Sequence, residues 1–167
     1  TGLYWAALQV QTRLHFGVQQ HQRELQELAE LLCRTVGGSR SCPAGWKSLG
    51  SSCFSFSAEA LGWAGARDAC ADLGAHLAVV GSEDEQVFLM ENTNRSSSYW
   101  MGATDEEQEG KWVWITGENP DFRFWDVWVT DPDKELKDCG AIGPEGRWIS
   151  DFCSRPNRWI CEKPWNC

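Results

Sequence analysis

Apolar side chains in the first 36 residues recur at alternating spacings of four and three, the spacing of a heptad repeat. The neighbouring Gln, Glu and Arg residues are good helix formers, so the pattern predicts a helical stalk over residues 1–36. We expect a homo-oligomer through this stalk; packing of the helix on its own domain is the alternative. Residues 37–41 then predict a linker. The seam consists of Leu14, Val18, His21, Leu25, Leu28 and Leu32.

Residues 42–167 lose the heptad spacing and predict a second domain. The stretch "GWKSLGSSCFSFS" alternates about a central turn, which indicates a β-hairpin flanked by Cys42 and Cys53. Later short aromatic stretches predict further strands. These stretches are "YWMGA", "KWVWI", "RWI" and "RWICEK".

Two helices are expected between the hairpin and the later strands. The second of them should begin at Ser82, whose hydroxyl can cap it while Glu85 completes a capping box. Helices followed by strands and loops predict an α+β fold. The first helix is indicated by the helical spacing of Leu61, Ala64, Ala69 and Leu73.

Charge and cysteine content limit the function classes. The formal net charge is −9 and the pI about 4.8, whereas nucleic-acid binding needs clustered Lys and Arg, so we expect no nucleic-acid partner. Eight cysteines, an even number with no CxxC pair, indicate an oxidising compartment rather than a zinc site. Asn94, in the tripeptide Asn-Arg-Ser, fits an N-glycosylation acceptor and agrees with that compartment.

Neither catalysis nor a membrane span is predicted. The three histidines, His15, His21 and His76, give no nucleophile a neighbouring base, so the sequence does not indicate an enzyme. No run reaches the roughly 20 apolar residues that span a bilayer. Because the sequence begins without Met, we expect a membrane anchor outside it. We expect the protein to lie on the extracellular face of the plasma membrane or to be secreted.

Six motifs follow one another between Cys42 and Lys163. Each is weak alone, but together and in this order they resemble the C-type lectin-like domain family, particularly type II receptors of the liver-sinusoid lectin and low-affinity IgE receptor kind. The resemblance implies two helices, short antiparallel sheets and a long irregular loop, and extracellular recognition as the function. The motifs are "CPAGWKSLGSSCF", "HLAVVGSEDEQVFL", "YWMGA", "KWVWITG", "GRWISDFC" and "WICEK".

The resemblance also implies a disulfide framework. Cys33 and Cys167 remain outside it, and they pair either with each other or between the stalks of an oligomer. Closing the longest loop of the framework contributes about 4–5 kcal/mol by the chain-entropy estimate. The implied pairs are Cys42 with Cys53, Cys70 with Cys161, and Cys139 with Cys153.

In sugar-binding members of the family, a Glu-Pro-Asn or Gln-Pro-Asp tripeptide, a later Glu and an Asn-Asp pair hold one calcium ion. A gapless alignment places the tripeptide on residues 129–131 and the later Glu on Lys137, while the pair becomes Ile149 and Ser150. Only Asp131 keeps a carboxylate. A positive charge about 4 Å from a divalent ion costs about 8 kcal/mol at an effective dielectric of 20, so this alignment predicts loss of the calcium and no cofactor.

A shifted alignment stays open, in which calcium is the cofactor and is bound by Asp131, Asp133, Glu135 and Asp151. Under the gapless alignment, an exposed Trp128 with Val129 and Ile149 would form an apolar patch for a protein partner; inward folding of Trp128 is the alternative. The candidate ligand-binding residues are Trp128, Val129, Asp131, Lys137, Trp148, Ile149 and Ser150.

The other aromatic and acidic stretches favour structural roles. The stretch "DEEQEG" is expected to be a solvated turn. The sequence therefore predicts a cell-surface recognition domain that binds a glycoprotein, carbohydrate or protein ligand outside the cell without the usual calcium. The alternatives are a calcium-dependent lectin and an assembly protein driven by its stalk. Residues expected in the core are Trp46, Trp63, Trp100, Trp112, Trp114, Trp125, Trp148 and Trp159.

Overall fold

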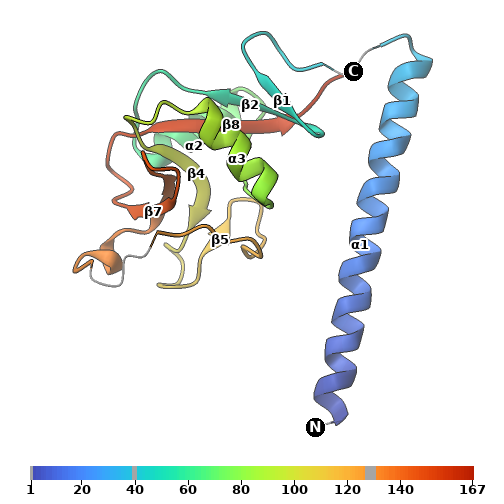
Figure 1. The fold of residues 1–167 in the computed structure, drawn as a ribbon, viewed down its shortest axis with the longest axis horizontal. Helices are drawn as coiled ribbons and strands as arrows, with labels where there is room; N and C mark the ends of the chain where they lie inside the picture. Colours follow the sequence, from blue (N-terminus) through green and yellow to red (C-terminus); the bar gives the residue numbers. More distant parts are fainter. Residues whose placement is uncertain (1, 39–40, 127–130) are drawn as a thin grey trace. The chain divides into compact units, whose positions relative to one another are not determined.

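The computed structural model describes residues 2–38, 41–126 and 131–167. The chain divides into two compact units, Thr1–Ser41 with Asn166–Cys167, and Cys42–Trp165. The first unit contains the helix α1 (Gly2–Thr35), as the heptad pattern predicts. The second is an α+β domain that consists of one sheet and two helices, α2 and α3 (Figure 1).

The sheet of the second unit has the strand order β1-β2-β8-β4-β6-β7, with β3 added to β8 and β5 to β4. Every pair is antiparallel except β4 with β8, which run parallel. The predicted hairpin and the predicted aromatic strands are all present. Their bounds are β1 (Lys47–Leu49), β2 (Ser52–Phe56), β3 (His76–Leu77), β4 (Tyr99–Thr104), β5 (Val113–Trp114), β6 (Cys139–Ile142), β7 (Trp148–Asp151) and β8 (Arg158–Pro164).

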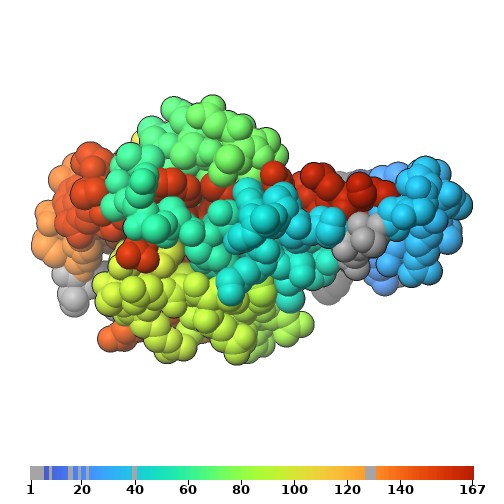
Figure 2. Space-filling model, turned by 90° about the horizontal axis from the view of Figure 1, so that it is seen from above, coloured from blue at the N-terminus to red at the C-terminus, as the bar shows by residue number. Residues whose placement is uncertain are grey.

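The two helices of this domain are α2 (Trp63–Asp72) and α3 (Glu83–Asn92). Figure 2 shows the green residues around α2 and the yellow-green residues around α3 on opposite sides of the band that contains β8 in red. The sheet therefore has a helix on each side, and its buried side chains form two hydrophobic clusters.

Helix α2 is present where the sequence predicts it, but its buried face is different. The helical spacing that indicated α2 runs through Leu61, Ala64, Ala69 and Leu73, whereas the residues that α2 buries are Trp63, Ala66 and Cys70. Two specific bonds explain this rotation, because the Trp63 indole N–H donates to the carbonyl oxygen of Met101 (2.9 Å) and Cys70 is bonded to Cys161. A hydrogen bond and a disulfide thus outweigh the burial of two leucines.

Helix α3 begins as the capping-box pattern predicts. Ser82 is in extended backbone, and its hydroxyl accepts the N–H of Glu85 at 3.2 Å. The Glu85 carboxylate accepts the N–H of Gly81 (2.7 Å) and so satisfies one more backbone donor at the helix start. Three acidic residues lie in the first turn, where the helix dipole favours negative charge.

Four disulfides are present, and they are the three pairs that the resemblance implied together with Cys33–Cys167. In this single chain Cys33 and Cys167 pair with each other, which is the first of the two alternatives. Cys33 lies near the end of α1, so its bond attaches the last residue of the chain to the stalk.

The apolar seam of α1 is exposed in the single chain. Leu14, Val18 and Leu25 are 57–65% exposed, and they line an apolar groove of about 650 Å³ along the helix. At the middle of the groove the ring Nδ1 of His21 lies 2.9 Å from the carbonyl oxygen of Gly17. Burial of this groove requires packing against another surface, either a second copy of the stalk or the chain's own domain.

Candidate functional site

A polar pocket of about 280 Å³ lies where β7 meets the residues on either side of the long loop. One wall contains Asp131 and Lys137, which flank the short 3-10 helix η1 (Lys134–Leu136). A second contains Ile149 and Ser150 of β7. The remaining lining residues are Ser98, Asp126, Asp151, Arg155 and Asn157.

Lys137 and Asp131 form the closest ion pair of this pocket. The Lys137 Nζ atom lies 2.6 Å from Asp131 Oδ2, and the two side chains are only 17% and 22% exposed. The hydrogen bond from Lys137, and then the N–H of Asp133, hold the pKa of Asp131 below its ordinary value. The pair thus stabilises the fold above the ordinary pKa of Asp, and this contribution is lost as the pH falls through the lowered pKa.

The floor of the pocket is Asp151, which is 3% exposed. Its Oδ1 atom accepts the N–H of Phe152 (2.9 Å) and lies 3.2 Å from the guanidinium of Arg155, while Oδ2 accepts the side-chain amide of Asn157 (2.9 Å). Both carboxylate oxygens are therefore engaged by groups of the protein itself. Lys137 and Arg155 each also lie within 6 Å of the Phe152 ring.

The structure brings together four of the seven candidate ligand-binding residues. Asp131, Lys137, Ile149 and Ser150 line the pocket. Trp148, the first residue of β7, is fully buried, and its indole N–H donates to Gln86 Oε1 (2.6 Å), so it supports the site without reaching a ligand. Trp128 and Val129 lie outside the described residues.

The four acidic residues of the shifted alignment are only partly brought together. Asp131 and Asp151 share the pocket. Asp133, which precedes η1, and Glu135, which lies within it, are exposed and do not line the pocket. Arg155, Asn157 and Ser98 were missed by the sequence analysis. They stand outside every motif that suggested a site, and the pattern "SRPNR" had given no reason to suspect them.

A second acidic group lies at the turn after β4. Carboxylate oxygens of Asp105, Glu109 and Asp138 lie within 4.8 Å of one another. Asp105 is 4% exposed, which corrects the prediction that the whole stretch "DEEQEG" is a solvated turn. One oxygen of Asp105 accepts the N–H of Gly110 (2.8 Å), but its Oδ1 and the Oδ1 of Asp138 are buried without a hydrogen-bond partner.

The electrostatics of this group favour a cation. Burial raises the pKa of Asp105 above its ordinary value, the N–H of Gly110 partly opposes this, and the charges of Glu109 and Asp138 raise it further. Two orphaned carboxylate oxygens beside a third carboxylate are the hard oxygen donors that Ca²⁺ takes, so the residues present fit such an ion.

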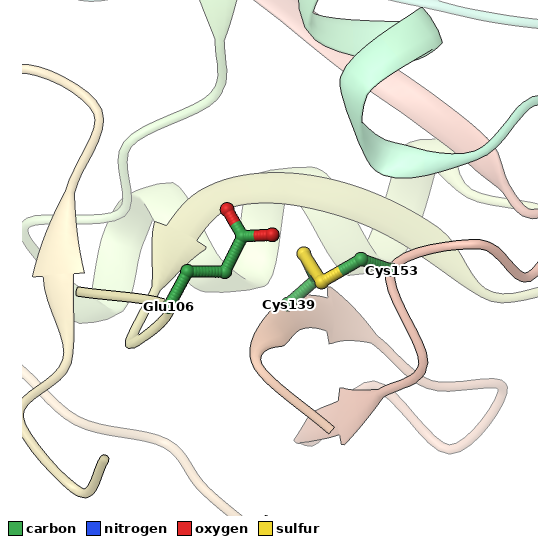
Figure 3. A group of neighbouring side chains, drawn as sticks. All are labelled: Glu106, Cys139 and Cys153. Atoms are coloured by element: carbon green, nitrogen blue, oxygen red, sulfur yellow. A yellow bond between two sulfur atoms is a disulfide. The ribbon is translucent and has the colours of Figure 1, made fainter. Parts of the chain in front are cut away.

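A third group consists of Glu106 and the two sulfur atoms of Cys139 and Cys153. Figure 3 shows the Glu106 carboxylate pointing toward the sulfurs. Because the two cysteines are bonded to each other, they offer no thiolate to a metal, and this group is not a metal site in the oxidised protein.

Comparison with known proteins agrees with this fold and framework. The family described as "Lectin C-type domain" matches residues 59–163, nearly the whole of the second unit. This chain belongs to the C-type lectin domain family. The second unit, Cys42–Trp165, here called the lectin domain, contains the pocket, the acidic group and three of the four disulfides described above.

Relatives of this lectin domain include receptors. Human asialoglycoprotein receptor 2 is 37% identical over 140 residues, which cover 79% of this chain and 44% of the receptor. The chain thus spans about half the length of the curated relatives it matches first.

Solved structures of the same fold include proteins with different properties. One is described as a "calcium-independent type II antifreeze protein" (TM-score 0.69, 28% identity, covering 77% of this chain and 98% of the other). Another is the "trimeric structure of Kupffer cell C-type lectin receptor Clec4f" (TM-score 0.63, 28% identity, covering 86% and 94%).

Proposed function

We propose that this lectin domain is the extracellular recognition part of a cell-surface receptor, and that its pocket binds a glycan or protein ligand without calcium at the usual sugar position. The domain would comprise residues 42–167, carried on the stalk. The observation that supports this most is the ion pair of Lys137 with Asp131. The name of asialoglycoprotein receptor 2 supports a glycoprotein or glycan ligand.

Lys137 supplies a positive charge where the sugar-binding relatives place a calcium-binding Glu. Its ammonium already neutralises Asp131, and the neighbouring Asp151 is engaged by Arg155, Asn157 and a backbone N–H. A divalent ion would have to displace these partners and approach a cation, so the residues at this position do not fit calcium. That a type II antifreeze protein of this fold is described as calcium-independent supports such an arrangement.

The pocket residues can recognise a ligand directly. Lys137 and Arg155 provide donors, Asp131 and Ser150 provide acceptors, and Ile149 adds a small apolar surface. A calcium-dependent lectin through Asp131, Asp133, Glu135 and Asp151 remains the alternative, and the exposure of Asp133 and Glu135 outside the pocket weighs against it. Trp128 and Val129 remain candidate ligand contacts on the sequence alone.

The experiment is a glycan-array and cell-binding assay of the whole chain in chelator and in calcium. We expect binding that is unchanged by chelator and at least tenfold weaker in K137A, because this variant removes a donor and leaves Asp131 unneutralised. The matched control is K134A, an exposed lysine three residues away in η1, which should stay within twofold. Binding abolished by chelator while the domain remains folded would instead support the calcium-dependent alternative.

Calcium is proposed at the group Asp105, Glu109 and Asp138, where it would stabilise the fold rather than contact the ligand. Extracellular calcium sites have dissociation constants of about 0.1–1 mM. At 10 mM calcium the expected gain in unfolding free energy is therefore about 1.4–2.7 kcal/mol. The measurement is a urea unfolding curve in chelator and in calcium.

The matched variant for the calcium proposal is D105N. In chelator it should be more stable than the wild type at neutral pH, because the raised pKa of Asp105 means that its stabilising contribution is present below the ordinary Asp pKa and lost as the pH rises through the folded-state value. D105N should also lose the response to calcium. A full calcium response in D105N would place the ion elsewhere.

Asn94 is proposed as an N-glycosylation site. It is exposed after α3, and its side-chain oxygen accepts both the N–H (3.1 Å) and the hydroxyl (2.8 Å) of Ser96, so the tripeptide is folded locally at the surface. Secreted from mammalian cells, the protein should lose mass on treatment with an N-glycan-releasing enzyme, and S96A should not. Equal masses before and after treatment would remove the site from the proposal.

The stalk is proposed to form a homo-oligomer, and the membrane anchor to lie outside this sequence. The exposed seam of α1 and the trimeric receptor of the same fold support the first proposal. In the described part of the chain, no helix combines the length and apolar character of a membrane span. The proposed function is binding without catalysis.

A further inference from the structure

The Cys139–Cys153 bridge has a carboxylate beside it. Within the part of the chain that the structure describes, it is the one disulfide with a carboxylate oxygen within 4.8 Å of both sulfur atoms. That carboxylate belongs to Glu106, an exposed residue at the turn after β4 whose backbone N–H donates to the hydroxyl of Thr104 (3.2 Å). Figure 3 shows that it faces the sulfurs from the adjacent turn.

The two cysteines of this bridge differ in burial. Cys139 lies on β6 and is fully buried, whereas Cys153, after β7, is half-buried. If an external thiolate attacks the less buried residue, Cys153, the sulfur of Cys139 is the leaving group. By contrast, both cysteines of Cys70–Cys161 are buried, at 0% and 1% exposed.

The charges around the leaving sulfur are negative. Glu106 adjoins Asp105, and Cys139 adjoins Asp138, so the acidic group described above continues to the bridge. Negative charge repels an incoming anionic thiolate, and it disfavours the thiolate that forms on Cys139. Glu106 is the member of this set closest to both sulfurs, and its exposure makes it the first charge that a reagent meets.

We propose that Cys153 is a thiol-exchange site, and that Glu106 makes it selective for cationic or neutral small thiols over anionic ones. In the first step the thiolate of a small thiol bonds to Cys153 Sγ, the Cys139–Cys153 bond breaks, and Cys139 leaves as a thiolate that takes a proton from water. A second thiolate then attacks the sulfur of the small thiol, releasing Cys153 and a small-molecule disulfide. Two thiols are oxidised as one protein disulfide is reduced.

The exchange would act on the ligand pocket. Cys139 pairs with Asp151 in the β6–β7 ladder, and the segment after Cys153 contributes Arg155 and Asn157 to the pocket. Opening the bridge removes the covalent bond that joins Cys153 to β6. Asp151, which forms the pocket floor two residues before Cys153, is then held less firmly. The thiol-exchange site thus gives the pocket a sensitivity to the thiols outside the cell. This inference is independent of which ligand the pocket binds.

The test compares three reductants on the intact oxidised chain in chelator: cationic cysteamine, neutral 2-mercaptoethanol and anionic glutathione, at equal thiolate concentrations. Alkylation and peptide mass spectrometry give a rate for each disulfide separately. A unit charge about 4–5 Å away in a water-like dielectric changes a rate about fourfold. We therefore expect the cysteamine-to-glutathione rate ratio at Cys139–Cys153 to be about three- to tenfold higher in the wild type than in E106Q.

The matched control is E107Q, which removes the same charge one residue further along the turn and should leave the ratio unchanged. The difference in rate ratio between wild type and E106Q should also become smaller in 0.5 M salt, because salt screens the charge of Glu106. The proposal is wrong if E106Q keeps the wild-type ratio, or if E107Q lowers it equally. It is also wrong if Cys139–Cys153 is reduced no faster than the buried Cys70–Cys161 pair.

Discussion

Replacement of Trp148 by alanine is expected to lower the unfolding free energy of the lectin domain by about 3–5 kcal/mol through the lost aromatic volume. The Trp148 ring lies 5.4 Å from that of Trp114, 5.5 Å from Trp125 and 5.8 Å from Phe122, measured between centroids. The Oε1 atom of the buried Gln86 would also lose its donor, which adds about 1–3 kcal/mol. The total unfolding free energy of a domain of this size is about 5–15 kcal/mol, so W148A should be largely unfolded or close to it.

Milder variants separate the packing of Trp148 from its hydrogen bond. W148F keeps an aromatic ring but leaves Gln86 Oε1 without its donor, and we expect a loss of about 1–3 kcal/mol in urea unfolding. Q86L breaks two hydrogen bonds in the wild type, the one from Trp148 and the one that Gln86 Nε2 donates to the Gly146 carbonyl (2.6 Å), but only the second in W148F. Q86L should therefore cost less stability in W148F than in the wild type. If W148F were as stable as the wild type, the hydrogen bond to Gln86 would have no measurable role in holding β7 under the pocket.

The second large effect is expected from L25E in the stalk. Leu25 is 65% exposed in the single chain and belongs to the heptad seam, so a charge there should leave the lectin domain folded while preventing helix association. Sedimentation should give a monomer mass for L25E and a multiple of it for the wild type. Loss of multivalent attachment should weaken binding to a ligand-coated surface by about 10²–10⁴-fold, with little change for a soluble monovalent ligand.

The control for L25E is Q26E, which adds the same charge at the next residue, off the seam. It should keep the wild-type mass. These measurements also address the hypothesis of an assembly protein driven by its stalk, since a monomeric L25E that loses no surface binding would contradict the multivalent receptor. A wild type that is itself monomeric at micromolar concentration would remove the oligomer from the proposal.

The parts of the fold that were predicted correctly depend on local chemistry. Ser82 and Glu85 predict the start of α3, because a capping box is formed by residues that are three apart in the sequence. The heptads of α1 and the alternation of the hairpin are periodicities of single elements. The rotation of α2 could not be predicted in this way, because it is decided by the partners Met101 and Cys161, which lie far away in the sequence.

The pocket residues likewise divide into those that the sequence indicated and those that depend on contacts in the folded domain. Asp131, Lys137, Ile149 and Ser150 were found because the resemblance aligns them with positions of known sugar sites, and the structure places them around one cavity. Arg155 and Asn157 join them only because Asp151 turns inward and binds both. Similarly, nothing in "DEEQEG" indicates that Asp105 is buried, since its burial depends on Asp138 at the start of a distant strand.

The Cys33–Cys167 bond has a consequence for proteolytic release of the lectin domain from its stalk. The domain is joined to the stalk once through residues 34–41 and again through the disulfide at the last residue of the chain. A protease that cuts anywhere between residues 34 and 41 therefore leaves the domain covalently attached, now by its carboxyl end. Release by such a cut also needs a reductant, so proteolysis and reduction must act together to free the recognition domain from its stalk.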